Sequence, residues 1–154
     1  MTLATRVAVL REGALVQFHD PRQIYRRPAN RFIAEFIGRP AMNTFDGHVA
    51  GGIFQAAGFA CPMPGRPDGP LVIGIRPEQI EIVDQSASDA LAFSVDVVEL
   101  VEPDVLVFAK SGASALIVRT YNDDQPFETG APIHLRFPPA ALHTFDAVSG
   151  ARLP

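Results

Sequence analysis

The sequence is poor in several residue types on which common functions depend. Among its 154 residues there is one cysteine and no tryptophan. The single cysteine, Cys61, excludes an internal disulfide and a cysteine zinc cluster, which suits a reducing compartment. No apolar stretch approaches the roughly 20 residues that span a bilayer, and the apolar run near the N-terminus is too short for a signal peptide. We therefore expect the chain to stay in the cytoplasm.

Lysine is equally scarce, and this bears on nucleotide chemistry. The only lysine is Lys110, which stands in the sequence FAKSG without the preceding glycine of a GxxxxGK[ST] phosphate loop. Without the loop amides and that lysine, nothing cradles the β- and γ-phosphates of a nucleotide. The sequence also lacks an LSGGQ-like signature and an apolar run ending in Asp-Glu. We therefore predict no catalytic residues, no cofactor-binding residues and no ATP chemistry for this chain alone.

Other residues that could carry chemistry favour structural interpretations. The histidines His19, His48, His134 and His143 share no metal-ligand spacing, so no metal site is predicted. The acidic residues Asp96, Glu99, Glu102 and Asp104 could form paired carboxylates, but in a strand such residues usually face solvent.

The composition is that of a folded globular chain with an uneven charge distribution. Hydrophobic residues make up 47% and charged residues 19%, which argues against disorder. Residues 1–40 hold seven arginines against three acidic residues, whereas residues 41–154 hold six basic and fourteen acidic residues. An arginine-rich start could be a phosphate or nucleic-acid surface. The alternative, which we favour, is a solvated face, because Arg22, Arg26, Arg27 and Arg31 lie opposite an apolar stripe.

Two short helices are predicted in the run HDPRQIYRRPANRFIAEFIGRPAMN, residues 19–43. Asp20 can cap the first helix, Pro21 suits its first turn, and Pro28 ends it. The second helix begins near Asn30 and carries an apolar stripe of Phe32, Ile33, Phe36 and Ile37.

After Pro40 the pattern changes to short strands separated by turns, which places a domain boundary near residues 38–43. The predicted strands are 44–50, 53–57, 71–76, 91–102, 105–110, 115–121 and 132–137. Alternation within residues 91–98 and 115–119 is typical of half-buried strands that close a small OB-like barrel. The proline-rich stretch 61–70 is predicted to be an exposed loop.

The sequence Arg76-Pro77-Glu78 is the strongest candidate site. Pro77 holds Arg76 in an extended conformation and leaves a cation and a carboxylate near one turn. Two interpretations stay open: a turn-stabilising ion pair at an exposed position, or a contact between subunits.

The run at residues 19–43 closely resembles "LYRRPANRFVAEFIG", the end of the nucleotide-binding domain in ATP-binding subunits of bacterial ABC importers of the sugar and glycerol-phosphate type. MTLATRVAVLREG at the start resembles a strand of the same family. GIRPEQI (74–80) resembles its "GIRPEHL", and HTFDAVSGARL (143–153) resembles its closing "HLFDAETGRRL". These matches bracket nearly the whole chain.

The resemblance implies a mainly β fold: an OB-like TOBE barrel over residues 41–154, preceded by a small α/β remnant of an ABC nucleotide-binding domain over residues 1–40. It implies a regulatory and dimerisation role in an importer of sugars or related solutes, at the inner face of the cell membrane. The implied partners are a second copy of the subunit and the membrane permease subunits. ATP and Mg²⁺ would be bound by the complete family member and not by this chain.

Two further expectations follow. Without the rest of the nucleotide-binding domain, Ile24, Phe32, Phe36 and Ile37 should lose their packing partners, so residues 1 to about 38 should be locally unstable or should self-associate, while the barrel stays folded. The continuous apolar run Val97–Val101 should lie at a subunit contact.

The alternative function is a stand-alone OB-fold module that binds a small ligand or oxyanion, for which Ser111, Gly112 and Ser114 are candidates; a plain hairpin turn explains them equally well. Nucleic-acid binding is less favoured, because the barrel is acidic and has one tyrosine and no tryptophan.

Overall fold

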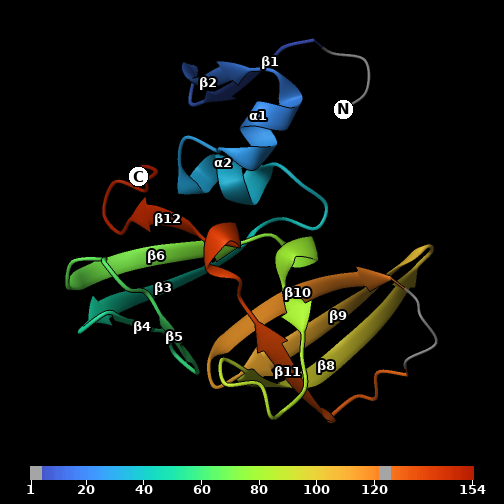
Figure 1. The fold of residues 1–154 in the computed structure, drawn as a ribbon. Helices are drawn as coiled ribbons and strands as arrows, with labels where there is room; N and C mark the ends of the chain where they lie inside the picture. Colours follow the sequence, from blue (N-terminus) through green and yellow to red (C-terminus); the bar gives the residue numbers. More distant parts are fainter. Residues whose placement is uncertain (1–4, 122–125) are drawn as a thin grey trace.

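The computed structural model describes residues 5–121 and 126–154. In this part of the chain the strands form a two-stranded hairpin and two five-stranded sheets, and every strand pair is antiparallel. Figure 1 shows the hairpin and two short helices standing on one side of the two larger sheets. The predicted fold class, mainly β with a small α/β segment in front, is confirmed. Within the described residues no helix is long and apolar enough to cross a membrane.

The N-terminal segment consists of β1 (Val7–Arg11), β2 (Ala14–His19), α1 (Pro21–Arg26) and α2 (Arg31–Phe36). Both helices begin where the sequence predicts. The Asp20 carboxylate accepts a hydrogen bond from the amide of Gln23, and the Asn30 side chain accepts one from the amide of Ile33. Each cap satisfies a donor that the first helical turn leaves unpaired.

The first large sheet has the strand order β12-β6-β3-β4-β5 and the second has the order β10-β9-β8-β11-β7. The strands of the first sheet are β3 (Asn43–Ala50), β4 (Ile53–Gln55), β5 (Ala60–Pro62), β6 (Gly69–Ile75) and β12 (His143–Asp146). Those of the second are β7 (Glu81–Ile82), β8 (Leu91–Val101), β9 (Asp104–Ser111), β10 (Ser114–Tyr121) and β11 (Pro132–Arg136). The 3₁₀ turns η1 (Pro77–Gln79) and η2 (Pro139–Ala141) follow β6 and β11.

All seven strands predicted after Pro40 are present, but three more were missed. One is β5, which lies at the start of the proline-rich stretch that we expected to be a loop throughout. Cys61 in β5 is buried and pairs with Phe54 in β4. The pairing is possible because β5 is an edge strand, where a proline costs no ladder bond on the outer side.

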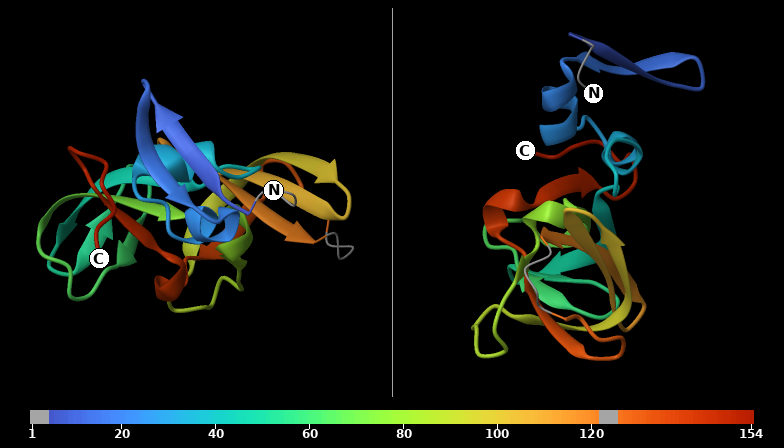
Figure 2. Two further views of the ribbon diagram at one scale, coloured as in Figure 1. Left: turned by 90° about the horizontal axis from the view of Figure 1, so that it is seen from above. Right: turned by 90° about the vertical axis from the view of Figure 1, so that its right-hand side faces the viewer.

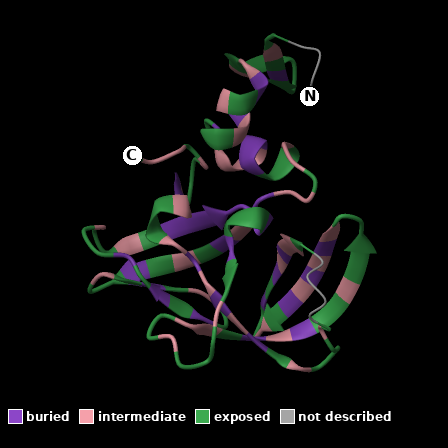
Figure 3. Ribbon diagram, turned by 45° about the vertical axis from the view of Figure 1, so that its right-hand side comes forward, coloured by how far each residue is buried: buried purple, intermediate pink, exposed green. Residues whose placement is uncertain are grey.

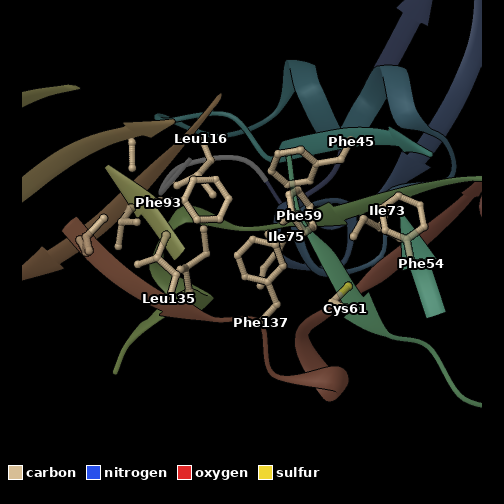
Figure 4. Close-up of a cluster of buried hydrophobic side chains, with 14 of the residues drawn as sticks. Phe45, Phe54, Phe59, Cys61, Ile73, Ile75, Phe93, Leu116, Leu135 and Phe137 are labelled. Atoms are coloured by element: carbon tan, nitrogen blue, oxygen red, sulfur yellow. The ribbon is translucent and has the colours of Figure 1, made fainter. Parts of the chain in front are cut away.

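A cluster of phenylalanine rings joins the two large sheets. Figure 4 shows Phe59 among them, and its ring centroid lies 4.9 Å from that of Phe45, 5.4 Å from that of Phe137 and 5.8 Å from that of Phe93. The first two contacts are edge-to-face and the third is tilted, geometries that aromatic pairs favour. The same cluster includes residues from both sheets, so the barrel has one continuous core.

The N-terminal helices pack against the barrel instead of standing free. Ala34 in α2 is buried with Met42, Val72 and Phe145, which belong to the linker, β6 and β12. Ile24 is 1% exposed. The expectation that Ile24 loses its partners is therefore wrong, because it is buried with Val9 of the hairpin and Ile33 of α2.

The C-terminal tail closes the same junction by backbone pairing. The amide of Arg152 donates to the carbonyl of Ala29 at 3.0 Å, and the amide of Arg31 donates to the carbonyl of Gly150 at 2.8 Å. Figure 2 shows the tail beside the helices, while the β1–β2 hairpin projects away from the barrel. On this outer part the apolar side chains Leu10, Leu15, Phe18 and Phe36 are exposed, and Figure 3 shows the hairpin mostly in the colour of exposed residues.

Gly58 lies where the β4–β5 turn touches the β9–β10 turn, so a substitution there tests this contact. A Cβ at Gly58 would lie 1.8 Å from the carbonyl oxygen of Ser111, and its φ is +144°. Gly58→Ala should destabilise the chain by at least about 2 kcal/mol more than Gly130→Ala. Gly130 is the matched control because its φ is +86° but its Cβ would meet nothing within 4 Å. Urea unfolding measures the unfolding free energy of each variant. Equal decreases for the two variants would show that the close contact at Gly58 does not contribute to stability.

Candidate functional site: the junction around Arg76

Arg76 follows the last residue of β6 and points back toward the N-terminal helices. Its side chain is 2% exposed, the largest of the fully buried side chains in the described residues. Pro77 fixes the start of η1, and Arg76 is held extended at φ −71° and ψ 141°. The sequence thus predicts its backbone correctly. The interpretation of Arg76 as a charge at an exposed turn is wrong, because helices α1 and α2 cover it.

The guanidinium group of Arg76 donates hydrogen bonds to three backbone carbonyls. Nη1 donates to the carbonyl of Ala34 at 3.1 Å and to that of Ile37 at 2.6 Å, and Nη2 donates to that of Tyr25 at 2.9 Å. These acceptors lie near the C-terminal ends of α2 and α1, where helical carbonyls lack partners and the helix dipole favours a cation. One side chain therefore holds both helix ends to the barrel.

The Tyr25 ring stacks against the same guanidinium group. The guanidinium carbon of Arg76 lies 4.0 Å from the centre of that ring, a cation–π contact. The Tyr25 hydroxyl donates to the carboxylate of Glu78. Burial, together with this bond to Glu78, raises the pKa of Tyr25 to about 12. Glu78 thus contacts helix α1 through Tyr25. Within the described residues no ion pair joins Glu78 to Arg76.

His143 and Arg152 form the other side of the junction. An Nη1 atom of Arg152 lies 2.7 Å from Nδ1 of the buried His143 ring. Burial, with the nearby charges of Arg152 and Arg76, lowers the pKa of His143 to about 4. The ring is therefore neutral at pH 7, and Nδ1 accepts the hydrogen bond from the guanidinium group.

The other residues considered from the sequence lie apart from this junction. The Ser111 hydroxyl donates to the carbonyl of Gly58 and the Ser114 hydroxyl to that of Ala57, so both are already used inside the chain. Gly112 packs against the same turn. In residues 5–121 and 126–154 no group of three His, Cys, Asp or Glu side chains could hold a metal ion.

Asp96, Glu99 and Glu102 are exposed, as expected, and Asp96 forms an exposed ion pair with Lys110. Asp104 is partly buried and forms an ion pair with Arg119. Burial raises the pKa of the Cys61 thiol to about 11, which makes it unreactive at pH 7.

Comparison with known proteins agrees with this architecture. Residues 73–145 match the family described as TOBE domain, and residues 43–82 match the CysA C-terminal regulatory domain. The sn-glycerol-3-phosphate import ATP-binding protein UgpC of Yersinia pestis is 37% identical over 99% of this chain and 44% of its own length. UgpC of Salmonella typhi is 36% identical over the same shares.

The chain is homologous to the C-terminal part of sugar-type ABC importer ATP-binding subunits. It carries their TOBE domain and spans less than half the length of the relatives named above. A crystal structure of the cytoplasmic molybdate-binding protein ModG with molybdate bound aligns at a TM-score of 0.53 and 12% identity, over 66% of this chain and 94% of that one. The likeness to ModG shows a shared fold.

Sequence reasoning found Arg76 and Glu78 but missed Tyr25, His143 and Arg152. Tyr25 sits in α1, whose apolar pattern gives no sign that its ring would cover an arginine. His143 and Arg152 are nine residues apart and meet because the tail turns back after Asp146. The one available signal was the quoted resemblance at residues 143–153, which includes both residues.

Arg76→Met should loosen the helices from the TOBE barrel. It removes three charge-assisted hydrogen bonds and leaves buried carbonyls unpaired, at a cost of about 2–3 kcal/mol in unfolding free energy. Hydrogen exchange should speed up at residues 24–37 while β9 and β10 keep their protection. Arg22→Met on exposed α1 surface is the control. Unchanged exchange at residues 24–37 would refute the role given to Arg76.

His143 should make stability depend on pH. Because the folded-state pKa, about 4, lies below the ordinary value of 6.5, the unfolded chain binds the proton first as pH falls. Stability contributed by the neutral ring is present above pH 6.5 and is lost toward pH 4, by up to about 3 kcal/mol. Urea titrations across this window should show a smaller decline for His143→Gln than for the wild type. Parallel declines would contradict a buried neutral ring.

Proposed function

We propose that this chain is the regulatory and dimer-forming part of the ATP-binding subunit of an ABC importer for sugars or related solutes. The observation that carries the proposal is the alignment of 99% of the chain with such subunits, together with the match to a C-terminal regulatory domain. ATP and Mg²⁺ would be bound by a nucleotide-binding domain whose motifs these residues lack. Membrane permease subunits, at the inner face of the cell membrane, would be the partners of the complete subunit.

The proposal assigns residues 1–40 to the end of the nucleotide-binding domain and residues 41–154 to the TOBE domain. The exposed apolar side chains Leu10, Leu15, Phe18 and Phe36 support it. They gather on the β1–β2 hairpin and α2, away from the barrel, where the remainder of a nucleotide-binding domain would cover them.

The outward face of β8, β9 and β10 is the surface that we assign to the dimer. The bulge at Asp96 turns Val97 and Val101 outward, and cross-strand pairing places Val97 beside Phe108 and Phe108 beside Ile117. Val97 is 46% exposed and Val101 51% exposed. With Leu106, these residues form the outer apolar face, and a groove of about 440 Å³ runs between this face and residues 38–41. An apolar outward face is typical of an interface between copies.

Of the candidate contact residues Arg76, Pro77 and Glu78, only Glu78 can touch a second subunit directly. Arg76 and Pro77 are buried, whereas Glu78 is exposed. Glu78 lines a cleft together with Asp104 and Arg119, which also line the groove beside the outer apolar face. We assign the direct contact to Glu78, with Arg76 and Pro77 as the residues that position it.

A second candidate is an OB-fold module that binds a small ligand or oxyanion. Its support is the fold shared with ModG, whose described ligand is molybdate. The hydroxyls of Ser111 and Ser114 donate to backbone carbonyls, so we assign a ligand site to the junction around Arg76 instead.

Sedimentation equilibrium tests the dimer. The wild-type chain should form a reversible dimer at concentrations on the order of hundreds of micromolar, unaffected by ATP. The double variant Val97→Glu, Val101→Glu should be monomeric, because two buried unpaired charges oppose association. Val148→Glu is the matched control, since Val148 is 94% exposed on another part of the chain. A monomeric wild type, or a double variant that still dimerises, would reject the outer apolar face as the interface.

A further inference from the structure

A cleft of about 480 Å³ lies where α1, η1 and the η2–β12 segment meet. Its ionisable lining comes from both ends of the chain: Tyr25 and Arg26 from α1, Arg76 and Glu78 from the middle, and His143 and Arg152 from the C-terminal part. Figure 1 shows the η2–β12 segment and the turn after β6 on the side of the barrel that faces the helices. Ala140, Ala141 and Leu142 form an apolar wall. We call this space the cationic cleft.

The charges in the cationic cleft are unbalanced. Three arginines line it, and Glu78 is its only carboxylate. Arg76 contacts neutral carbonyls, and Arg152 contacts the neutral His143 ring. Arg26 forms no ion pair within the described residues. Arg26 is exposed and Arg152 is partly buried, whereas Arg76 is buried. A buried cation in a protein is normally paired with an anion, and Arg76 has no such partner in the described residues.

Unused hydrogen-bond donors accompany this charge. Nε of Arg76 is buried and has no partner in the described residues. Because Nδ1 of the neutral His143 ring accepts from Arg152, the ring proton lies on Nε2, which becomes a donor. Burial and the charge of Arg27 lower the pKa of Arg152, which means that they destabilise its charged form. A bound anion would stabilise that charged form.

We propose that the cationic cleft binds a phosphate group, either the free ion or the head of a small phosphate monoester. A tetrahedral dianion has the several acceptor oxygens that planar guanidinium forks match in pairs, which a monovalent halide lacks. The apolar wall offers a place for the carbon part of an ester. Since Arg26 belongs to α1 and Arg152 to the tail, a shared anion would draw the N-terminal helices and the barrel together.

Calorimetric titration of the full chain with inorganic phosphate, sn-glycerol 3-phosphate and chloride tests the site. Phosphate or its ester should bind once per chain and saturate, and chloride should not. Tighter binding of the free ion would identify it as the ligand, and tighter binding of the ester would identify the monoester. Absence of saturable binding by either compound at about 10 mM, a free energy near −3 kcal/mol, would overturn the proposal.

Two variants locate the binding. The double variant Arg26→Gln, Arg152→Gln should bind at least tenfold more weakly, because it removes two guanidinium donors while Arg76 keeps the helices in place. Arg22→Gln is the control, since Arg22 lies on the same helix but outside the cleft. If the double variant and Arg22→Gln lowered the affinity for phosphate equally, the attraction would be unspecific and the site would be refuted. Thermal unfolding without ligand confirms that each variant is folded, and the result is independent of dimer formation.

Discussion

The buried guanidinium group of Arg76 is the contact on which the relation between the two parts of the chain depends. Helices α1 and α2 have six residues each, too short to be stable in water by themselves. A single cation at their C-terminal ends satisfies three carbonyls and matches the direction of both helix dipoles. The phenylalanine core fixes the barrel, but it does not reach the helices, which pack through Ala34 and are held by Arg76.

The same group connects the two surfaces that we assign to function. Nη1 of Arg76 lies 3.0 Å from where a Cβ at Gly38 would be, so a larger residue would disturb the linker that borders the outer apolar face. On its other side Arg76 lines the cationic cleft. Residues 38–41 thus lie between Arg76 and the outer apolar face.

Local features could be predicted from the sequence, and long-range ones could not. Asp20, Pro21 and Asn30 set the helix starts because capping depends on neighbours within three residues. The alternation in residues 91–98 predicts the strand, although the bulge at Asp96 reverses the faces beyond it. The surroundings of Arg76 could not be predicted, because Tyr25, Ala34 and Ile37 lie 39–51 residues away along the chain. An arginine beside a proline and a glutamate is usually exposed, so the composition of the segment pointed to the surface.

NMR of the Arg76 side chain tests the central claim most directly. A guanidinium group that is buried, bonded to three carbonyls and stacked on a ring rotates and exchanges its protons slowly. We expect a slowly exchanging Nε–H signal, separate Nη–H signals, and nuclear Overhauser effects between Arg76 and the Tyr25 ring. A single averaged Nη signal that exchanges as fast as those of exposed arginines such as Arg22, without contacts to Tyr25, would contradict it.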